Sequence, residues 1–338
     1  MDPLSHAVLG YAVRAAGRTP ITRRLGVAAV VGALAPDLDS VFMPIGWDVY
    51  LRVHEVGTHT LLGTLPVAGA VGLVTRGRSA IPWPTLVLAA WLGALSHVAL
   101  DVLCGARIRV GWPLSDLRTH VPLVAMADPW LIGASVMTAI ALALVPAQRG
   151  RVARLALGVV CGFLLIKSLW LVRAIATLDG IDGPPVEAQI VEARWPTLRE
   201  WHVYQGTPRS LRHVIVAPDR RPTVVGTWDR APETPLVTRS RALDTVRNLL
   251  AVHELAFARE NTRPGGDAEV LWSDIRYCWS PDTDEIAAPV GPVVTGPDSR
   301  TIACGLWFGG TFDIRGRPLA QRVHVFGALQ TRAPRRQQ

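Results

Sequence analysis

The chain has 338 residues, of which 49% are hydrophobic and only 18% are charged, and its mean hydropathy is +0.27. This composition excludes an ordinary soluble protein, and the length allows two domains. The net charge of +8 comes almost wholly from arginine, and the arginines cluster between apolar runs, as membrane topology requires. They form no continuous basic stripe of the kind that binds nucleic acid, so we expect no nucleic-acid partner.

Apolar runs make up most of the first 180 residues. Two short runs, over residues 3–16 and 25–35, predict helices that are too short to cross a bilayer alone. Longer runs approach the roughly 20 residues that a transmembrane helix needs, and they cover residues 59–75, 84–104, 122–146 and 153–178. The sequence therefore predicts an α-helical membrane bundle over residues 1–180, with about four transmembrane helices and two N-terminal apolar helices.

Residues 185–338 differ, because short alternating segments are bounded there by Pro, Gly, Asp and Asn. This pattern is typical of strands and turns, so the sequence predicts a mixed, β-rich soluble domain. One helix is expected within it, over residues 240–259. Cys278 and Cys304 both fall in this half, where a disulfide is possible if the domain faces an oxidising compartment.

The loops of the bundle predict its orientation. The first and third loops between the expected spans together carry five arginines, against three in the second loop. Because basic residues concentrate in cytoplasmic loops, the last span would deliver residues 185–338 to the outside. We therefore expect a multi-pass protein of the cytoplasmic (inner) membrane with an extracytoplasmic C-terminal domain.

Two ionisable residues lie within one apolar run, in the segment LSHVALDVL. His97 and Asp101 are four residues apart, so both project from one face of a helix. Ionisable groups in a bilayer are costly and are usually tied to function or to a partner. The pair has two interpretations, as metal ligands or as a buried ion pair that satisfies itself.

A second histidine pair lies in the segment HEVGTHTLL. His54 and His59 are five residues apart, so one regular helix cannot point both at the same site. We expect His54 in a loop that approaches a helix, with Thr58 near the N-cap and His59 in the first turn. The loop could then fold His54 back toward His59.

Imidazole and carboxylate groups recur near the ends of the apolar runs, and together they are the ligands of zinc, manganese and iron hydrolytic sites. Taken singly, His6 is explained as a buried histidine and PDLD as a turn. Taken together, they predict a divalent metal, with Zn²⁺ as the first expectation and Mn²⁺ or Fe²⁺ as alternatives. The expected ligands are His6, Asp37, Asp39, His54, His59, His97 and Asp101.

This ligand set exceeds what one tetrahedral ion needs, so it predicts a dinuclear site or one ion with a rich outer shell. Asp37 and Asp101 are the expected catalytic carboxylates. Two further carboxylates, Asp116 and Asp128, stand near junctions of loops and helices. They are explained more simply as helix caps than as bases.

The motifs LSH, PDLD, HEVGTH and LSHVALD occur in this order at residues 4–6, 36–39, 54–59 and 95–101. In this order they resemble the membrane-bound metal-dependent hydrolases of the YdjM type, also described as LexA-regulated inner-membrane hydrolases. WPLSDLRTH at residues 112–120 and ADPW at residues 127–130 look like the branch with a C-terminal soluble extension. The resemblance implies a hydrolase of the inner membrane and leaves its substrate open.

The predicted function is hydrolysis of a phosphoester or lipid-like ester by metal-activated water, with the lipid bilayer and such an ester as partners. The His-x3-Asp pair also resembles zinc-dependent phospholipases C and nucleases, by analogy only. A metal or proton transporter is an alternative, in which the same groups form a relay. Another alternative is a membrane scaffold whose C-terminal domain binds a partner. The segment LWSDIRYCW in that domain carries polar and aromatic side chains, but the alternation of a strand explains them without a binding function.

Overall fold

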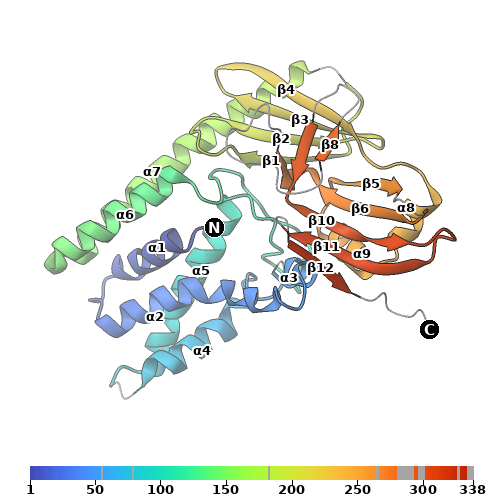
Figure 1. The fold of residues 1–338 in the computed structure, drawn as a ribbon. Helices are drawn as coiled ribbons and strands as arrows, with labels where there is room; N and C mark the ends of the chain where they lie inside the picture. The colour runs from blue at the N-terminus through green and yellow to red at the C-terminus, as the bar shows by residue number, and fades with distance from the viewer. Residues whose placement is uncertain are drawn as a thin grey trace.

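The computed structural model describes residues 1–54, 56–77, 80–181, 183–262, 266–279, 293–295, 301–325 and 328–332. Helices form one end of the molecule and strands the other (Figure 1). The helical part consists of α1 (Pro3–Ala15), α2 (Arg23–Leu34), η1 (Ala35–Phe42), α3 (Trp47–His54), α4 (Thr64–Arg76), α5 (Trp83–Leu103), α6 (Pro129–Leu144), η2 (Pro146–Gln148), α7 (Arg149–Ala176) and η3 (Thr177–Gly180).

Within the described residues, three helical segments are long and apolar enough to cross a membrane: Arg23–Phe42, Trp83–Leu103 and Pro146–Asp179. The expected count of four is therefore not confirmed. Because η1 continues α2, a run expected to be too short reaches 20 residues. The run expected over residues 59–75 becomes α4, which has only 13 residues.

The run expected to start at residue 122 differs for another reason, since helix α6 begins only at Pro129 and has 16 residues. Its first apolar residues form an extended segment against the end of α5. The backbone N–H groups of Leu123 and Val124 donate to the carbonyl of Leu103 at 2.9 and 3.0 Å, and both side chains are buried. Hydropathy alone cannot distinguish such a buried extended segment from a helix.

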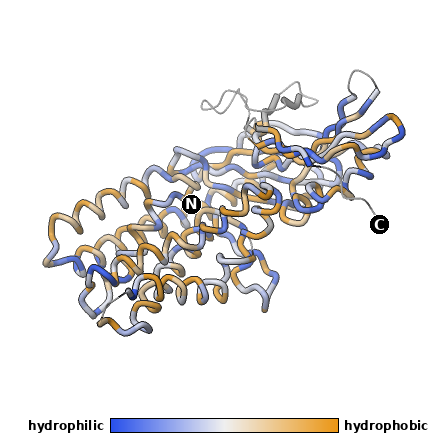
Figure 2. Tube along the Cα trace, turned by 60° about the horizontal axis from the view of Figure 1, so that its bottom comes forward, coloured by the Kyte–Doolittle hydropathy of each residue, from blue (hydrophilic) through white to orange (hydrophobic). Residues whose placement is uncertain are grey.

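Close packing of α2 against α5 organises the bundle. A Cβ atom added to Gly32 would lie 2.1 Å from the carbonyl oxygen of Ala90, and one added to Gly93 would lie 2.1 Å from that of Ala29. Only glycine permits this approach of two backbones, which is common between membrane helices. Hydrophobic residues run along the helices in Figure 2, and on α7 Leu155 and Leu169 are exposed, as a helix facing lipid requires.

The C-terminal half is rich in antiparallel strands, as expected. One sheet has the order β1-β2-β3-β4, with β1 (Ala188–Ala193), β2 (Trp201–Gly206), β3 (Ser210–Ala217) and β4 (Arg220–Asp229). A second has the order β12-β11-β10-β6-β5, with β5 (Ala256–Thr262), β6 (Ala268–Asp274), β10 (Leu306–Phe312), β11 (Pro318–Val325) and β12 (Ala328–Arg332). A small sheet joins β7 (Cys278–Trp279), β9 (Thr301–Cys304) and β8 (Val293–Thr295).

The single helix expected over residues 240–259 is wrong. The structure has two shorter helices, α8 (Pro235–Ser240) and α9 (Asp244–Val252), and residues 256–259 belong to β5. The helix ends because His253 has an extended backbone, with φ of −123° and ψ of 116°. The apolar residues after it then pair with β6.

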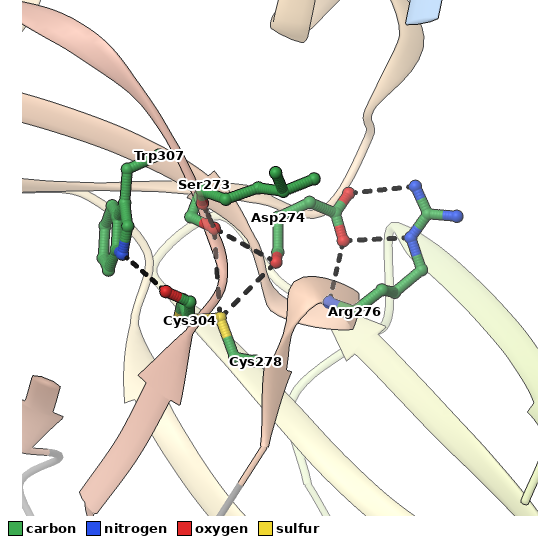
Figure 3. Close-up of a disulfide and its surroundings, with 7 residues drawn as sticks. Ser273, Asp274, Arg276, Cys278, Cys304 and Trp307 are labelled. Atoms are coloured by element: carbon green, nitrogen blue, oxygen red, sulfur yellow. Dashed lines mark hydrogen bonds and ion pairs between the residues drawn. A yellow bond between two sulfur atoms is a disulfide. The ribbon is translucent and has the colours of Figure 1, made fainter. Parts of the chain in front are cut away.

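Two further features join distant parts of the chain. Cys278 and Cys304 form a disulfide between the paired strands β7 and β9 (Figure 3).

The helical and strand-rich parts share a buried core, in which residues of β2 and β3 pack with residues of α5 and α7. The indole Nε1 of Trp201 also donates to the carbonyl of Pro122 at 2.7 Å. The bundle therefore packs directly against the first sheet.

Candidate metal centre

All seven predicted ligands lie in one cluster inside the helical part, contributed by five segments. His6 is on α1, Asp37 and Asp39 are on η1, His54 ends α3, and His97 is on α5 with Asp101 one turn later. His59 lies in the turn before α4. Ligand atoms of two overlapping groups come within 4.8 Å of one another, and the groups are Asp37, His54, His59 and Asp101, and His6, Asp37 and His97.

Two histidines at the centre direct their Nε2 atoms at each other. The Nδ1 of His97 lies 2.7 Å from the carbonyl oxygen of Ala33, which can only accept, so Nδ1 carries the hydrogen. The Nδ1 of His59 lies 3.4 Å from Oδ2 of Asp39. In the neutral rings both Nε2 atoms then carry lone pairs, yet they lie only 3.0 Å apart. Such an arrangement suits a cation bound by both.

Two carboxylates complete the arrangement around these nitrogens. Oδ1 of Asp37 lies 3.4 Å from Nε2 of His59 and 3.5 Å from Nε2 of His97. Oδ2 of Asp101 lies 3.5 and 3.0 Å from the same two atoms. Zinc bonds of about 2.0–2.1 Å in a tetrahedron separate neighbouring ligand atoms by about 3.4 Å. The spacing of these four atoms fits a zinc-sized ion.

His6 lies beside the carboxylate of Asp101 and is a further candidate ligand. Its ring stacks on that of His97 with 3.9 Å between centroids, and its side chain is fully buried. Among the described residues, neither ring nitrogen has a hydrogen-bond partner, although Nε2 lies 3.3 Å from Oδ1 of Asp101. The same oxygen accepts from the amino group of Met1 at 2.8 Å. Buried ring nitrogens without a hydrogen bond are costly, and a metal ion bound at one of them would satisfy that nitrogen.

Asp39 holds the outer histidines in place. Its two oxygens lie 3.2 and 3.0 Å from Nδ1 of His54. The hydroxyl of Thr58 donates to the carbonyl of Pro36 at 2.8 Å and lies 3.2 Å from Oδ2 of Asp39. A carboxylate that orients ligand histidines from behind is a regular feature of metal sites.

The expected local structure of the second histidine pair is wrong. His54 is the last residue of α3 and not part of a loop. Helix α4 begins only at Thr64, with Gly63 as its N-cap, so His59 is not in a first helical turn. The turn persists because the hydroxyl of Thr60 donates to Gly57 and accepts from the backbone of Gly63. These bonds satisfy the backbone without a helix.

The cluster is buried but open at one edge. His59 and His97 are fully buried and Asp101 is 1% exposed, whereas the side chain of Asp37 is 36% exposed. Among the described residues, the three carboxylates form ion pairs with histidines and with the amino group of Met1. Buried carboxylates need a compensating positive charge, which a metal ion supplies. Asp37 therefore marks the edge at which the cluster is open to its surroundings.

Asp116 and Asp128 lie outside the cluster. Asp128 caps α6, where its Oδ1 accepts from the backbone N–H groups of Trp130 and Leu131 at 3.0 and 3.1 Å. Its other oxygen lies 3.4 Å from Nζ of the buried Lys167. Asp116 is exposed and lies 3.3 Å from Nη1 of Arg109. The cap expected at Asp128 is therefore present.

A pocket of about 230 Å³ borders His54, between the helical and strand-rich parts. Sequence reasoning missed two residues of its wall, Arg107 and His253. In the wall, Arg276 donates to Nδ1 of His253 at 2.5 Å, and burial lowers the pKa of His253. No local pattern reveals this pocket, because its residues come from segments far apart in the chain.

A model of the YdjM inner membrane protein family matches residues 1–174 of the 338. This stretch contains all seven residues of the cluster and ends within α7. No curated protein and no solved structure matches the chain.

Proposed function

We propose that this chain, which belongs to the YdjM inner membrane protein family, is a metal-dependent hydrolase that acts at the membrane surface. One observation carries the proposal. The Nε2 atoms of His59 and His97 face each other at 3.0 Å, and carboxylate oxygens lie 3.0 to 3.5 Å from them. This set of nitrogen and oxygen ligands is the one that hydrolytic zinc sites use.

His59, His97, Asp37 and Asp101 would hold the metal, with His6 as a further ligand. When bound, a divalent ion lowers the pKa of water and stabilises the oxyanions of an ester under attack. The chain does the positioning, because the Ala33 carbonyl fixes the ring of His97 and Asp39 fixes that of His59. Asp37, at the open edge, is placed to accept a proton from water.

A dinuclear site is supported by the overlap of the two groups of ligands. Both contain Asp37, and a shared carboxylate is how a protein bridges two ions. Zinc is the first expectation, because the donor set combines imidazole with carboxylate and contains no thiolate. The proposed substrate is a phosphoester or related ester.

Full-length protein in detergent tests this proposal by elemental analysis and by hydrolysis of a soluble chromogenic phosphodiester. Wild type should contain stoichiometric metal, and Asp101→Asn should lose the metal and at least about a hundredfold in rate. Asp116→Asn is the matched control, since it removes the same charge from an exposed residue outside the cluster. Metal without hydrolysis, together with ion flux in vesicles that His97→Ala abolishes, would make the protein a transporter.

We also propose that residues 185–338 lie outside the cytoplasm. The arginines of the loops indicate this orientation only if there are four spans, a number that is not confirmed. The proposal therefore rests on the Cys278–Cys304 disulfide, because disulfides persist in oxidising compartments. A phosphatase fused after Gln338 should be active in cells. Fluorescence from a green fluorescent protein at the same position would place the domain in the cytoplasm instead.

A further inference from the structure

An open apolar groove of about 840 Å³ lies beside the metal centre, between η1 and α4. Its wall includes Leu38, Val41 and Phe42 from η1, and Val67 and Ala70 from α4. Its volume falls in the range of about 300–1,000 Å³ that is usual for small-molecule sites. The groove is therefore large enough for a ligand and not merely a packing defect.

The groove reaches the metal centre through two of its polar lining residues, Asp39 and Thr58. Oδ2 of Asp39 lies 3.4 Å from Nδ1 of His59, and the hydroxyl of Thr58 lies 3.1 Å from the same nitrogen. Apart from these two and Thr60, the described lining consists of apolar side chains and glycine. The groove is therefore amphipathic, with an apolar body and a polar end at Asp39 and Thr58, which lie beside His59.

The groove is open, and its edge is exposed and apolar. Leu38 and Val41 are 70% and 69% exposed, and both belong to Arg23–Phe42, a segment that is long and apolar enough to cross a membrane. A contiguous apolar surface of this kind marks a contact with lipid or with a ligand. A hydrocarbon chain could therefore enter from the bilayer without crossing water.

We propose that the groove holds the hydrocarbon chain of a membrane lipid whose phosphate end reaches the metal centre. The proposal rests on the hydrolase function and narrows its substrate to a phospholipid or a lipid phosphate. In the reaction, the P–O bond to the leaving group breaks. Water supplies the new P–O bond, one of its protons goes to the leaving oxygen, and the chain remains in the groove.

Photo-crosslinking tests the groove without relying on hydrolysis. The probes are a phosphatidic acid and a phosphatidylglycerol, each with a diazirine in its acyl chain, added to full-length protein in detergent. Adducts should concentrate on η1 and α4 and fall at least fivefold in Ala70→Trp, which narrows the groove. Gly69→Trp is the matched control, because a Cβ there has no atom within 4 Å and Gly69 is not in the wall. Adducts spread evenly over α7, or unchanged in Ala70→Trp, would overturn the proposal.

Hydrolysis of phosphoesters of increasing chain length separates the two proposals. Below the micelle concentration, each added methylene should lower KM about fourfold until the groove is filled. Ala70→Trp should raise KM for long chains, whereas the control Gly69→Trp, outside the wall, should leave KM for long chains and turnover of a soluble ester unchanged. Hydrolysis without chain-length dependence would overturn the lipid substrate and keep the hydrolase. Crosslinking in the groove without any hydrolysis would overturn the hydrolase. The probe that is cleaved distinguishes a lipid phosphate from a phospholipid.

Discussion

Two buried groups of ionisable residues, one in each half of the chain, use similar side chains in different ways. In the strand-rich half, the carboxylate of Asp274 is fully buried, and Arg276 donates to it from Nε at 2.9 Å (Figure 3). Arg276 donates also to His253. In the bundle, carboxylates and histidine nitrogens surround one another, and the amino group of Met1 lies 2.8 Å from Oδ1 of Asp101.

The difference teaches how to recognise a ligand site. A second histidine pair, His202 and His213, also brings two ring nitrogens within 2.8 Å. A single hydrogen bond satisfies that pair, because one of the two nitrogens, Nδ1 of His202 or Nε2 of His213, can donate and the other can accept. At His59 and His97 the hydrogens are already committed elsewhere and carboxylates add negative charge. The bundle cluster could therefore hold an external cation, which the pair of His202 and His213 does not need.

The largest effect is expected from Arg276→Leu, which would leave the carboxylate of Asp274 buried without its cation. Removing one partner of a buried ion pair costs about 3–5 kcal/mol. Thermal unfolding should show this loss, and the metal content should stay unchanged. Arg199→Leu is the control, because it breaks a half-exposed pair with Asp219 and should cost about 1 kcal/mol or less. Equal losses of stability in the two variants would show that the buried pair of Arg276 and Asp274 matters no more than an exposed pair.

Removal of metal should have the next largest effect. A ligand at 100 times its Kd stabilises the folded state by about 2.7 kcal/mol. Chelation should therefore lower the Tm of wild type, and added zinc should restore it. His97→Gln should not respond to either treatment. A wild-type Tm that chelator leaves unchanged would mean that the cluster satisfies itself.

Acid should destabilise the β half through His202. Burial lowers the pKa of His202 to about 4, and Arg194 adds to this effect. Because the unfolded chain then binds more protons, this stability is complete above about pH 6.5 and is lost as the pH falls toward 4. Between pH 7 and pH 5 the loss is about 2 kcal/mol.

Thermal unfolding of metal-free wild type and His202→Gln at the two pH values measures this loss. The variant cannot gain a proton at this position, so it should lose less stability in acid. The same acid sensitivity in both proteins would show that the His202 ring is not kept neutral in the fold.

Asp39→Asn should have the smallest effect, because the amide keeps an oxygen that accepts from His59 and His54. Loss of such an outer partner usually weakens metal binding 10–100-fold, and we expect about tenfold here. Competition with a chromophoric chelator measures the affinity, with Asp116→Asn as control. Complete loss of metal would instead make Asp39 a direct ligand.

Much of the cluster is predictable because it depends on residue types and short spacings. The four-residue spacing of His97 and Asp101 places both on one face of α5, as the structure has it. The convergence of His6, Asp37 and His59 with this pair was predicted because histidines and carboxylates recur near the ends of the apolar runs and together form a metal ligand set. That these residues bind metal or catalyse hydrolysis stays a prediction.

The local structure was less predictable where long-range contacts decide it. The turn that carries His59 is fixed partly by a bond from the backbone of Leu61 to the carbonyl of Val110. The extended segment at Leu123 depends on the end of α5. Neither partner lies within a local sequence window, so hydropathy predicted helices in both places. The groove and the pocket beside His54 were missed for the same reason.

Helix α3 links the metal centre to the opposite end of the chain. Its Asp48 is 1% exposed, accepts from the amide of Asn248 at 2.8 Å and lies 2.9 Å from the guanidinium of Arg332. The same helix ends at His54. During synthesis on the ribosome, the inner ligands on α1, η1 and α5 emerge long before these partners do. We expect the centre to mature in two stages, and released chains that end before residue 248 should bind zinc more weakly than the full chain of 338 residues.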